Sequence, residues 1–283
     1  MVEKEMNMAS AQETSALRGQ IEISNLRRTF VRGARKRTVI DGCDLSIEAG
    51  KLTVMIGPSG CGKSTLAKVI AGYDKPDGGT VTIDGRPVSG AGRDRLMVFQ
   101  ESALFSWMTT EKNAYYGLEQ AERVTPDKRD EVETFLDQVG LARFAKRYPN
   151  ELSGGMQRRL EMVRALVNKP DLFILDEPFR GLDAMTRALM QEHFAAMFEA
   201  TRCTALFITT DIDEALLLAD HLLIMTNSPM TVAAKLIIDL PRPRKLATIF
   251  TDERANMFKE TTMNLLYPEA MRSFEEQTVS RAS

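Results

Sequence analysis

The sequence predicts an α/β fold, in which helices flank a mostly parallel sheet, on three observations. An apolar run at 52–56 precedes a glycine-rich loop at 57–65, and a helical pattern follows the loop. Two further apolar runs, at 172–175 and 204–208, have the length and composition of parallel strands buried on both faces. Strand and helix patterns alternate along most of the chain. The exception is 102–148, where helical patterns dominate, so we expect a helical subdomain there.

Size and composition restrict the kinds of protein that this chain can be. With 283 residues and a formal net charge of −2, it can bury a large core but has no basic excess for binding nucleic acid. No apolar run reaches the ~18–20 residues that span a bilayer, because Asp220 and His221 interrupt the nearest approach, at 216–225. The three cysteines are isolated and indicate neither disulfides nor a metal site. Residues 1–18 lack a hydrophobic signal core, and we expect a disordered tail there.

The glycine-rich loop fits the phosphate-binding motif G-x-x-x-x-G-K-[ST] in its required context of strand, loop and helix. Its residues are Gly57, Pro58, Ser59, Gly60, Cys61, Gly62, Lys63, Ser64 and Thr65. Glycines allow successive backbone N–H groups to face an anion, and the helix N-terminus adds unsatisfied donors. Lys63 would reach the outer phosphates of a nucleotide, and the Ser64 hydroxyl would bind Mg²⁺. The alternative is a plain turn, and the complete motif argues against it.

Four short segments around the loop are predicted to be strands: 21–26, 39–48, 80–85 and 95–99. Phe30 follows the first of them. Its ring could stack on adenine or pack in the core, and the sequence by itself favours neither. Gln100 lies at the C-terminal end of the last segment, which is where ligands bind in open α/β sheets.

A second glycine-containing sequence lies at the start of the predicted helix that follows residues 102–148. Ser153, Gly154 and Gly155 combine a hydroxyl with bare backbone, which would allow a second anion to approach. The alternative is a plain N-cap formed by Ser153. Local physics favours the N-cap.

The apolar run at 172–175 ends in two carboxylates, Asp176 and Glu177. Adjacent carboxylates at the end of a buried strand cost free energy unless a positive group lies beside them, and Mg²⁺ with phosphate would supply it. Because successive strand residues point in opposite directions, Asp176 would support the metal while Glu177 would orient or polarise a water. A capped strand end is the alternative, which the phosphate loop disfavours.

The C-terminal part of the chain continues the alternation of predicted strands and helices. The strand at 204–208 leads to Thr210 and to Asp211, which is predicted to cap the next helix. The last dozen residues are expected to fray. The other elements are a helix at 186–200, strands at 222–225 and 232–240, an extended connector at 241–244 and a helix at 252–266.

Five features in this order resemble the nucleotide-binding subunit of ABC transporters, over about residues 20–245. They are the phosphate loop, Gln100, Leu152-Ser153-Gly154-Gly155, the strand ending in Asp176-Glu177, and Gly181-Leu182-Asp183. Smaller features are similar to the bacterial nitrate, sulfonate and taurine importers. These are Gln100-Glu101-Ser102, Ser106-Trp107-Met108-Thr109, Asp183-Ala184-Met185-Thr186-Arg187 and Asp239-Leu240-Pro241-Arg242-Pro243-Arg244.

The resemblance implies a P-loop NTPase core with an N-terminal antiparallel β subdomain and an α-helical subdomain at about 101–157. The cassette would span 19–245, and a C-terminal helical extension would follow at 246–283. Mg-ATP is the implied ligand and ATP hydrolysis the implied reaction.

In this family two cassettes pair head to tail around the nucleotides. Ser153–Gly155 would therefore serve the partner's ATP, and Asp183 would contact the partner across the dimer. Phe30 stands at the adenine-stacking position. Gln100 would sense Mg²⁺ and the attacking water.

The implied partners are a second cassette, identical or different, and an integral membrane permease, with a solute-binding protein outside the cytoplasm and no nucleic acid. The permease would dock on the helical subdomain near Gln100. Trp107 and Met108 are candidate contacts, although core packing would explain each equally well. The chain would be peripheral, at the cytoplasmic face of the bacterial inner membrane. The permease and receptor would select the solute, which this sequence does not identify.

One position departs from the family. Its members carry a histidine after the last buried strand, where it contacts the γ-phosphate and the catalytic glutamate, and this chain has Thr210. His193 and His221 lie elsewhere in the sequence. A threonine side chain is shorter and has no titratable proton near neutral pH. We therefore expect normal Mg-ATP binding and slow hydrolysis, with Glu177, Gln100 and Thr210 at the reacting end of the nucleotide.

Two readings of the function follow, and a third is weaker. Glu177 favours an ATPase subunit that drives solute import. Thr210 favours a largely non-hydrolytic, ATP-dependent clamp or regulatory subunit that is paired with an active cassette. A soluble ABC protein of DNA repair or translation would be expected to carry a coiled-coil insertion or a basic surface, which the sequence lacks.

Overall fold

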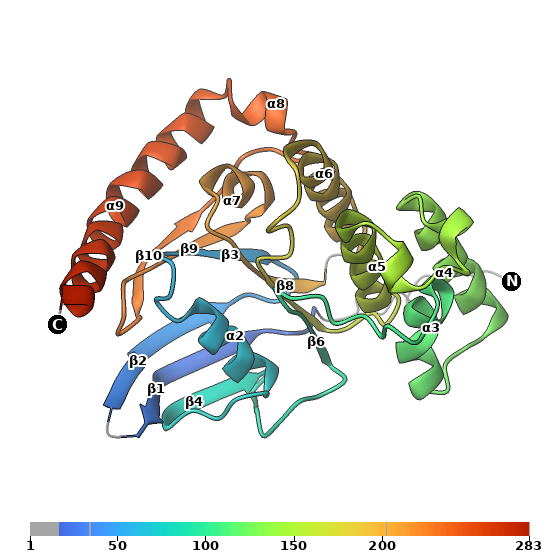
Figure 1. The fold of residues 1–283 in the computed structure, drawn as a ribbon. Coiled ribbons are helices and arrows are strands. Elements are labelled where there is room, and N and C mark those ends of the chain that lie inside the picture. The colour runs from blue at the N-terminus through green and yellow to red at the C-terminus, as the bar shows by residue number, and fades with distance from the viewer. Residues whose placement is uncertain (1–16, 34, 202, 283) are drawn as a thin grey trace, which may run out of the picture.

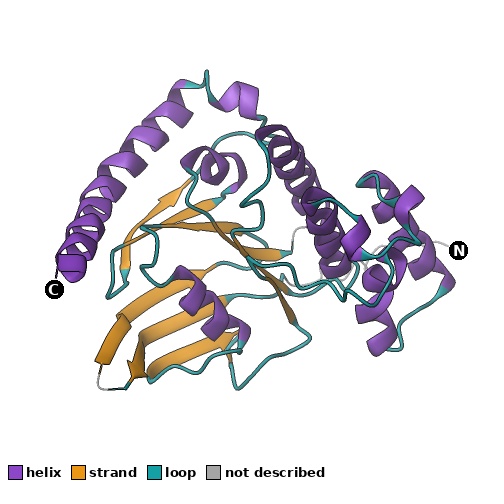
Figure 2. Ribbon diagram, in the orientation of Figure 1, coloured by secondary structure: helices purple, strands orange, loops and turns teal. Residues whose placement is uncertain are grey.

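The computed structural model of the protein describes residues 17–33, 35–201 and 203–282. Within them, a six-stranded, mostly parallel sheet forms the centre and a four-stranded antiparallel sheet lies beside it (Figure 1). Helices gather on the outer side of the central sheet and in a separate group at one end (Figure 2). The predicted α/β fold class is confirmed. The predicted tail at 1–18 lies almost wholly outside the described residues.

The central sheet has the strand order β10-β9-β3-β8-β7-β6. Only β10 runs antiparallel to its neighbour. The carboxyl ends of the parallel strands therefore meet at one edge, which is where ligands bind in such sheets. The bounds are β3 Leu52–Ile56, β6 Arg95–Val98, β7 Leu172–Asp176, β8 Thr204–Ile208, β9 His221–Met225 and β10 Val232–Ile237.

The middle strands are buried on both faces, as their apolar sequences predict. Val54 and Phe207 pack in a core with the outer helices, whereas their neighbours Met55 and Leu206 pack in a second core with α2 and the antiparallel sheet. This alternation follows from the two-residue period of a strand. The phosphate loop after β3 is thus anchored from both sides.

The antiparallel sheet has the order β2-β1-β4-β5. Its bounds are β1 Ile21–Arg32, β2 Arg35–Ile47, β4 Gly78–Ile83 and β5 Arg86–Pro87. The first strand is longer than predicted, because its pairing with β2 continues through a bulged register to Arg32. Phe30 therefore lies within β1, opposite Arg37, and not after the strand.

The helix α2 packs between the two sheets, and the other helices lie on the outer side of the central sheet or at one end of it. The bounds are α2 Lys63–Ala71, α3 Thr110–Gln120, α4 Pro126–Gln138, α5 Gly154–Leu166, α6 Ala184–Thr201, α7 Ile212–Leu218, α8 Leu246–Ile249 and α9 Glu253–Ala282, with short 3₁₀ turns at Ala142–Phe144 and Pro149–Glu151. Residues of α3, α4 and α5 share a third core. In Figure 1, α3 and α4 lie at one end of the molecule, and α5 joins them to the central sheet because it also contributes Met162 and Leu166 to the first core.

The terminal helix α9 corrects one expectation. It continues through Pro268 to Ala282, where fraying was predicted. The Glu269 carboxylate accepts a hydrogen bond from the Asn227 backbone N–H at 2.8 Å, and Leu266 packs against the outer core. These contacts hold the helix past the proline, whose missing N–H removes one helical hydrogen bond.

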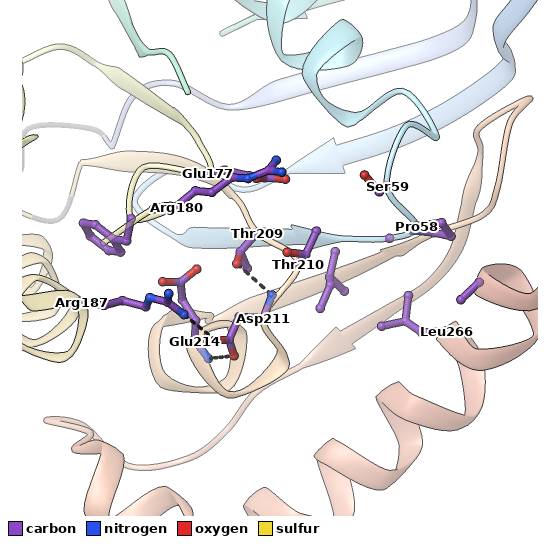
Figure 3. Close-up of a pocket in the computed structure, with 15 residues that line it drawn as sticks. Pro58, Ser59, Glu177, Arg180, Arg187, Thr209, Thr210, Asp211, Glu214 and Leu266 are labelled. Carbon is purple, nitrogen blue, oxygen red and sulfur yellow. Dashed lines mark hydrogen bonds and ion pairs between the residues drawn. The ribbon is translucent and has the colours of Figure 1, made fainter. Parts of the chain in front are cut away.

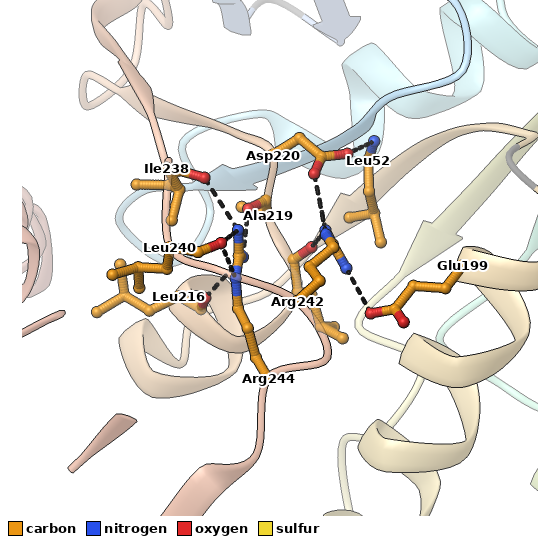
Figure 4. A network of polar contacts seen from close by, with 10 residues as sticks. Leu52, Glu199, Leu216, Ala219, Asp220, Ile238, Leu240, Arg242 and Arg244 are labelled. Carbon is orange, nitrogen blue, oxygen red and sulfur yellow. Dashed lines mark hydrogen bonds and ion pairs between the residues drawn. The ribbon is translucent and has the colours of Figure 1, made fainter. Parts of the chain in front are cut away.

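Two arginines in the connector after β10 hold the end of α7 (Figure 4). Arg242 pairs with Asp220 at 2.9 Å. The buried Arg244 donates to the carbonyls of Leu216 and Ala219, at and just beyond the end of α7, and to carbonyls of the connector. Burial, with Arg242 close by, lowers the pKa of Arg244 to about 10. Arg242 also donates to the Leu218 carbonyl, so both arginines satisfy backbone carbonyls that the helix end leaves free.

Candidate nucleotide-binding site

The phosphate loop joins β3 to α2 and needs two of its glycines. Gly60 and Gly62 have φ values of 76° and 129°, in the region that favours glycine. A Cβ at Gly62 would also come within 2.7 Å of the Val39 side chain. Because Gly62 is the N-cap of α2 and has no side chain to offer, the first amides of the helix remain available to a ligand.

Lys63 is folded back over the loop. Its side chain is 95% buried, with 5% relative exposure, and Nζ donates to the carbonyls of Gly57 and Pro58 at 2.8 Å each. These two hydrogen bonds place the Lys63 ammonium beside the loop amides. This is an environment suited to an anion.

Asp176, at the end of β7, is a buried carboxylate with an unused oxygen. Its side chain lies close enough to Ser64 for a hydrogen bond, while Oδ1 has no partner. Burial raises the pKa of Asp176, which the Ser64 hydroxyl and the charge of Lys63 partly offset. A buried, unpartnered carboxylate oxygen beside a hydroxyl suits a hard divalent cation such as Mg²⁺.

A cavity of about 420 Å³ collects most of the residues that the sequence predicts for one nucleotide. The loop, Gln100 and Glu177 line it together with Phe30. The Phe30 ring is 41% exposed, and the Arg28 guanidinium lies 4.6 Å from its centroid. Phe30 is therefore a partly exposed ring at the site rather than a core residue.

A second cavity, of about 520 Å³, adjoins the loop on its other side. Glu177, Thr210 and Arg187 line it, and Leu266 of α9 closes one wall (Figure 3). Thr210 is exposed and follows the buried Thr209 at the end of β8. Asp211 caps α7 as predicted, because its carboxylate accepts from the N–H groups of residues 213 and 214.

Glu177 has a fixed backbone and a paired side chain. Its φ is 46°, unusual for a residue with a Cβ, and its N–H donates to the Ile208 carbonyl at 3.0 Å. Its Oε2 lies 2.8 Å from Nη1 of Arg180. Arg180 was not among the residues predicted for the site from the sequence. The proline at 178, which favours a tight turn between the two residues, was the signal that could have found it.

Neither histidine takes the place of Thr210. His221 is buried at the start of β9, opposite Thr53 at the amino end of the parallel strands. Burial lowers its pKa. His193 lies inside α6, and among the described residues neither histidine lines either cavity.

Ser153, Gly154, Gly155 and Asp183 lie outside both cavities of this chain. Ser153 caps α5, because its hydroxyl accepts from the Met156 N–H at 3.3 Å. Asp183 accepts from the Thr186 N–H at 3.0 Å. Hydrogen bonding with the Thr186 side chain, and then with its N–H, lowers the pKa of Asp183. A second chain could reach both of these helix starts, since Ser153, Gly154 and Asp183 are exposed.

Cys61 lies in the loop but not at its surface. It is completely buried, and burial raises the pKa of its thiol. Its backbone N–H donates to the Pro58 carbonyl at 3.4 Å.

Within the described part of the chain, no helix combines the length and the apolar character needed to cross a membrane.

The comparisons with known proteins agree with this geometry. The family model described as "ABC transporter" matches residues 40–180. The chain is 38% identical over 248 residues to the bicarbonate transport ATP-binding protein CmpD of Synechococcus elongatus, covering 87% of this chain and 89% of that protein. It is 39% identical over 221 residues to the nitrate import ATP-binding protein NrtD of a Synechocystis strain, covering 78% and 83%.

A solved structure shows the same fold. It is the dimeric, post-hydrolysis state of the ATP-binding cassette MJ0796 bound to ADP and Pi, with a TM-score of 0.70 and 27% identity, and the match covers 78% of this chain and all of that one. Sequence and fold therefore lead to one conclusion: the chain is an ATP-binding cassette ATPase and belongs to the ABC transporter family.

Proposed function

We propose that this chain is the ATP-binding subunit of a bacterial importer of the nitrate, sulfonate and taurine group, with a cassette spanning about residues 19–245. The observation that carries the proposal is the single cavity in which the phosphate loop, Gln100 and Glu177 meet. The relatives named for nitrate and bicarbonate transport support an import role.

We assign nucleotide contacts by the chemistry of the donors. The amides of residues 57–65 and the Lys63 ammonium hold the phosphates, and the Phe30 ring stacks on adenine. The Arg28 guanidinium over Phe30 supports the ring from one face and leaves the other for a base.

Mg²⁺ fits the oxygen donors beside the loop. Ser64 and Gln100 offer side-chain oxygens in the cavity, and Asp176 offers its unpartnered Oδ1 nearby. When bound, the ion would neutralise charge on the outer phosphates. Glu177 would orient the attacking water from the other side of the strand end.

The active unit is a head-to-tail pair of cassettes. The exposed N-terminus of α5, with Ser153–Gly155, would cover the phosphates held by the partner's loop, and Asp183 would lie at the same interface. Two observations support this: these residues stay outside the cavities of one chain, and a similar cassette forms a dimer bound to ADP and Pi.

A membrane permease would dock on a hollow between β6 and the helical subdomain, next to Gln100. A cavity of about 510 Å³ there is lined by aromatic and arginine side chains, among them Phe105 and Arg164. Trp107 is 71% exposed, and its ring packs at a tilt against Phe105, with the ring centroids 5.3 Å apart. Docking of this kind would place the chain at the cytoplasmic face of the inner membrane, with a solute-binding protein reached through the permease.

Hydrolysis at this site should be slower than with a histidine at position 210. Losing one positioned polar contact to a transition state typically costs about 10²–10³ in rate. Thr210→His should therefore raise the steady-state ATPase rate of the purified protein, while the affinity for ATP changes little. The Glu177→Gln variant, which lacks the carboxylate proposed to orient the water, gives the baseline ATPase rate. A histidine variant no faster than the parent would refute the role of this position.

A further inference from the structure

We propose that Arg180 is a positioning residue for ATP hydrolysis. Its guanidinium holds the Glu177 carboxylate in place, a role that the uncharged side chain of Thr210 does not fill. This inference rests on the proposed function of Glu177. Arg180 lies outside the nucleotide-binding motifs and at the junction of the two cavities.

A tight turn puts Arg180 over Glu177. The Arg180 N–H donates to the Glu177 carbonyl at 3.1 Å, which closes a turn with Pro178 in its second position. Proline favours that position because its φ is already fixed near the value that the turn requires. The first and last residues of the turn thereby come side by side.

The turn itself is anchored in the protein core. Phe179, the third residue, is 2% exposed and packs against Phe194 and Phe207 at 6.3 and 5.6 Å. The buried Arg158 donates to the Pro178 carbonyl. Because its centre is held on both sides, the turn presents Glu177 and Arg180 in one arrangement.

The side chains then meet at the site. Arg180 Nη1 lies 2.8 Å from Glu177 Oε2, and the two lie together above Thr210 in Figure 3. Glu177 is 14% exposed and Arg180 is 60% exposed, so the carboxylate is the more shielded partner. The pair occupies one carboxylate oxygen and leaves Oε1 to accept a proton or a hydrogen bond from a water.

Other charged groups near Glu177 are already engaged. Lys63 is held by the carbonyls of its own loop. Arg187 donates to the Leu182 carbonyl at 3.1 Å and lies 3.8 Å from Asp211, across the cavity from Glu177. Among the residues that the structure describes, Arg180 is the one cationic side chain that lines both cavities, between the loop and the Thr210 side of the site.

A carboxylate with a free side chain samples several rotamers, and misplacement by about 1 Å can cost about 10²-fold in rate. Arg180→Ala should therefore lower kcat by about tenfold to a hundredfold, while KM for ATP and the affinity for a fluorescent ATP analogue change less than about threefold. Arg180→Lys keeps the charge on the same turn and should retain most of the rate.

The combination with Thr210→His distinguishes positioning from a structural role. A histidine at 210 would supply a second group for Glu177, so Arg180→Ala should cost much less in the Thr210→His background than in the parent. Arg272→Ala is the matched control, because Arg272 is also exposed and also pairs with a glutamate three residues away, Glu269. It should leave kcat unchanged. Melting temperatures of the two arginine variants should agree closely with the parent's, since each arginine is more than half exposed and ion pairs of such residues contribute little.

Three outcomes would overturn the proposal: an Arg180→Ala rate equal to the parent's, a faster rate, or an equal loss in both backgrounds. A parent that hydrolyses ATP no faster than Glu177→Gln would instead refute the proposed function of Glu177. The two failures are therefore distinguishable in one series of measurements.

Discussion

Asp176 shows how a single side chain can be stabilising with a ligand and destabilising without one. Burial raises its pKa, so the folded state holds a proton on this group more tightly than the unfolded state does. The ionised carboxylate therefore costs stability at neutral pH. This cost begins to fall once the pH drops below the raised pKa, and it is gone below the ordinary pKa of an aspartate. A bound cation would remove the cost.

Asp176→Asn should consequently stabilise the nucleotide-free protein while weakening its response to Mg²⁺. The amide keeps the shape of the side chain and carries no charge. We expect the melting temperature at neutral pH to rise by about 2 °C or more without nucleotide, and the additional increase caused by Mg²⁺ with ATP to shrink. Thermal unfolding with ATP, with and without Mg²⁺, measures both.

The matched control for this change is Asp239→Asn, since Asp239 is 60% exposed. It should alter neither quantity. An Asp176→Asn protein with the parent's melting temperature and the parent's response to Mg²⁺ would contradict the assignment of Asp176.

At the scale of elements, α7 connects the site with the C-terminal part of the chain. Its N-cap, Asp211, follows Thr210 directly, and its other end is held by Arg244. Arg244 satisfies four carbonyl groups from the end of α7 and from the connector. The position of Thr210 thus depends on contacts made at the opposite end of a short helix.

Arg244→Met should lower the free energy of unfolding by about 3 kcal/mol, because the apolar side chain fills similar space but leaves buried carbonyls without donors. Urea unfolding followed by circular dichroism measures this change. Arg254→Met is the control, since Arg254 is 54% exposed in its pair with Asp239 and should cost less than about 1 kcal/mol. Equal losses of unfolding free energy for the two variants would argue against this role of Arg244.

Much of the site follows from local sequence. The phosphate loop and the carboxylates after β7 could be located because each depends on its own strand and on the residues directly beside it. The fold class followed from the same runs, since a strand buried on both faces must be apolar throughout.

What the sequence did not reveal depends on contacts between distant segments. The Arg180–Glu177 pair requires a turn whose centre is buried by Phe194 and Phe207, residues that come later in the chain. The length of α9 depends on Glu269 reaching Asn227. Neither contact leaves a periodic pattern in the sequence.

For the whole molecule, head-to-tail pairing predicts complementation between inactive variants. Lys63→Ala disables the loop of its own chain, and Ser153→Arg blocks the phosphates held by the partner. Each variant alone should show little ATPase activity. A mixed dimer contains one site built from an intact loop and an intact Ser153, so an equal mixture should recover up to about a quarter of the parent's rate by random pairing.

Steady-state ATPase of the mixture, at a concentration where the chains exchange, measures the recovery. Two Lys63→Ala preparations mixed in the same way are the control. No recovery above the separate variants would contradict the shared site.

The central claim is that residues 57–65 hold the phosphates of ATP, with the Lys63 ammonium among the amides. Isothermal titration calorimetry of the purified protein with ATP and Mg²⁺ tests it most directly, with Lys63→Ala titrated in parallel. We expect a saturable heat of binding for the parent and at least a tenfold weaker affinity for the variant. Absence of binding to the parent, or equal affinity of the two proteins, would contradict the account.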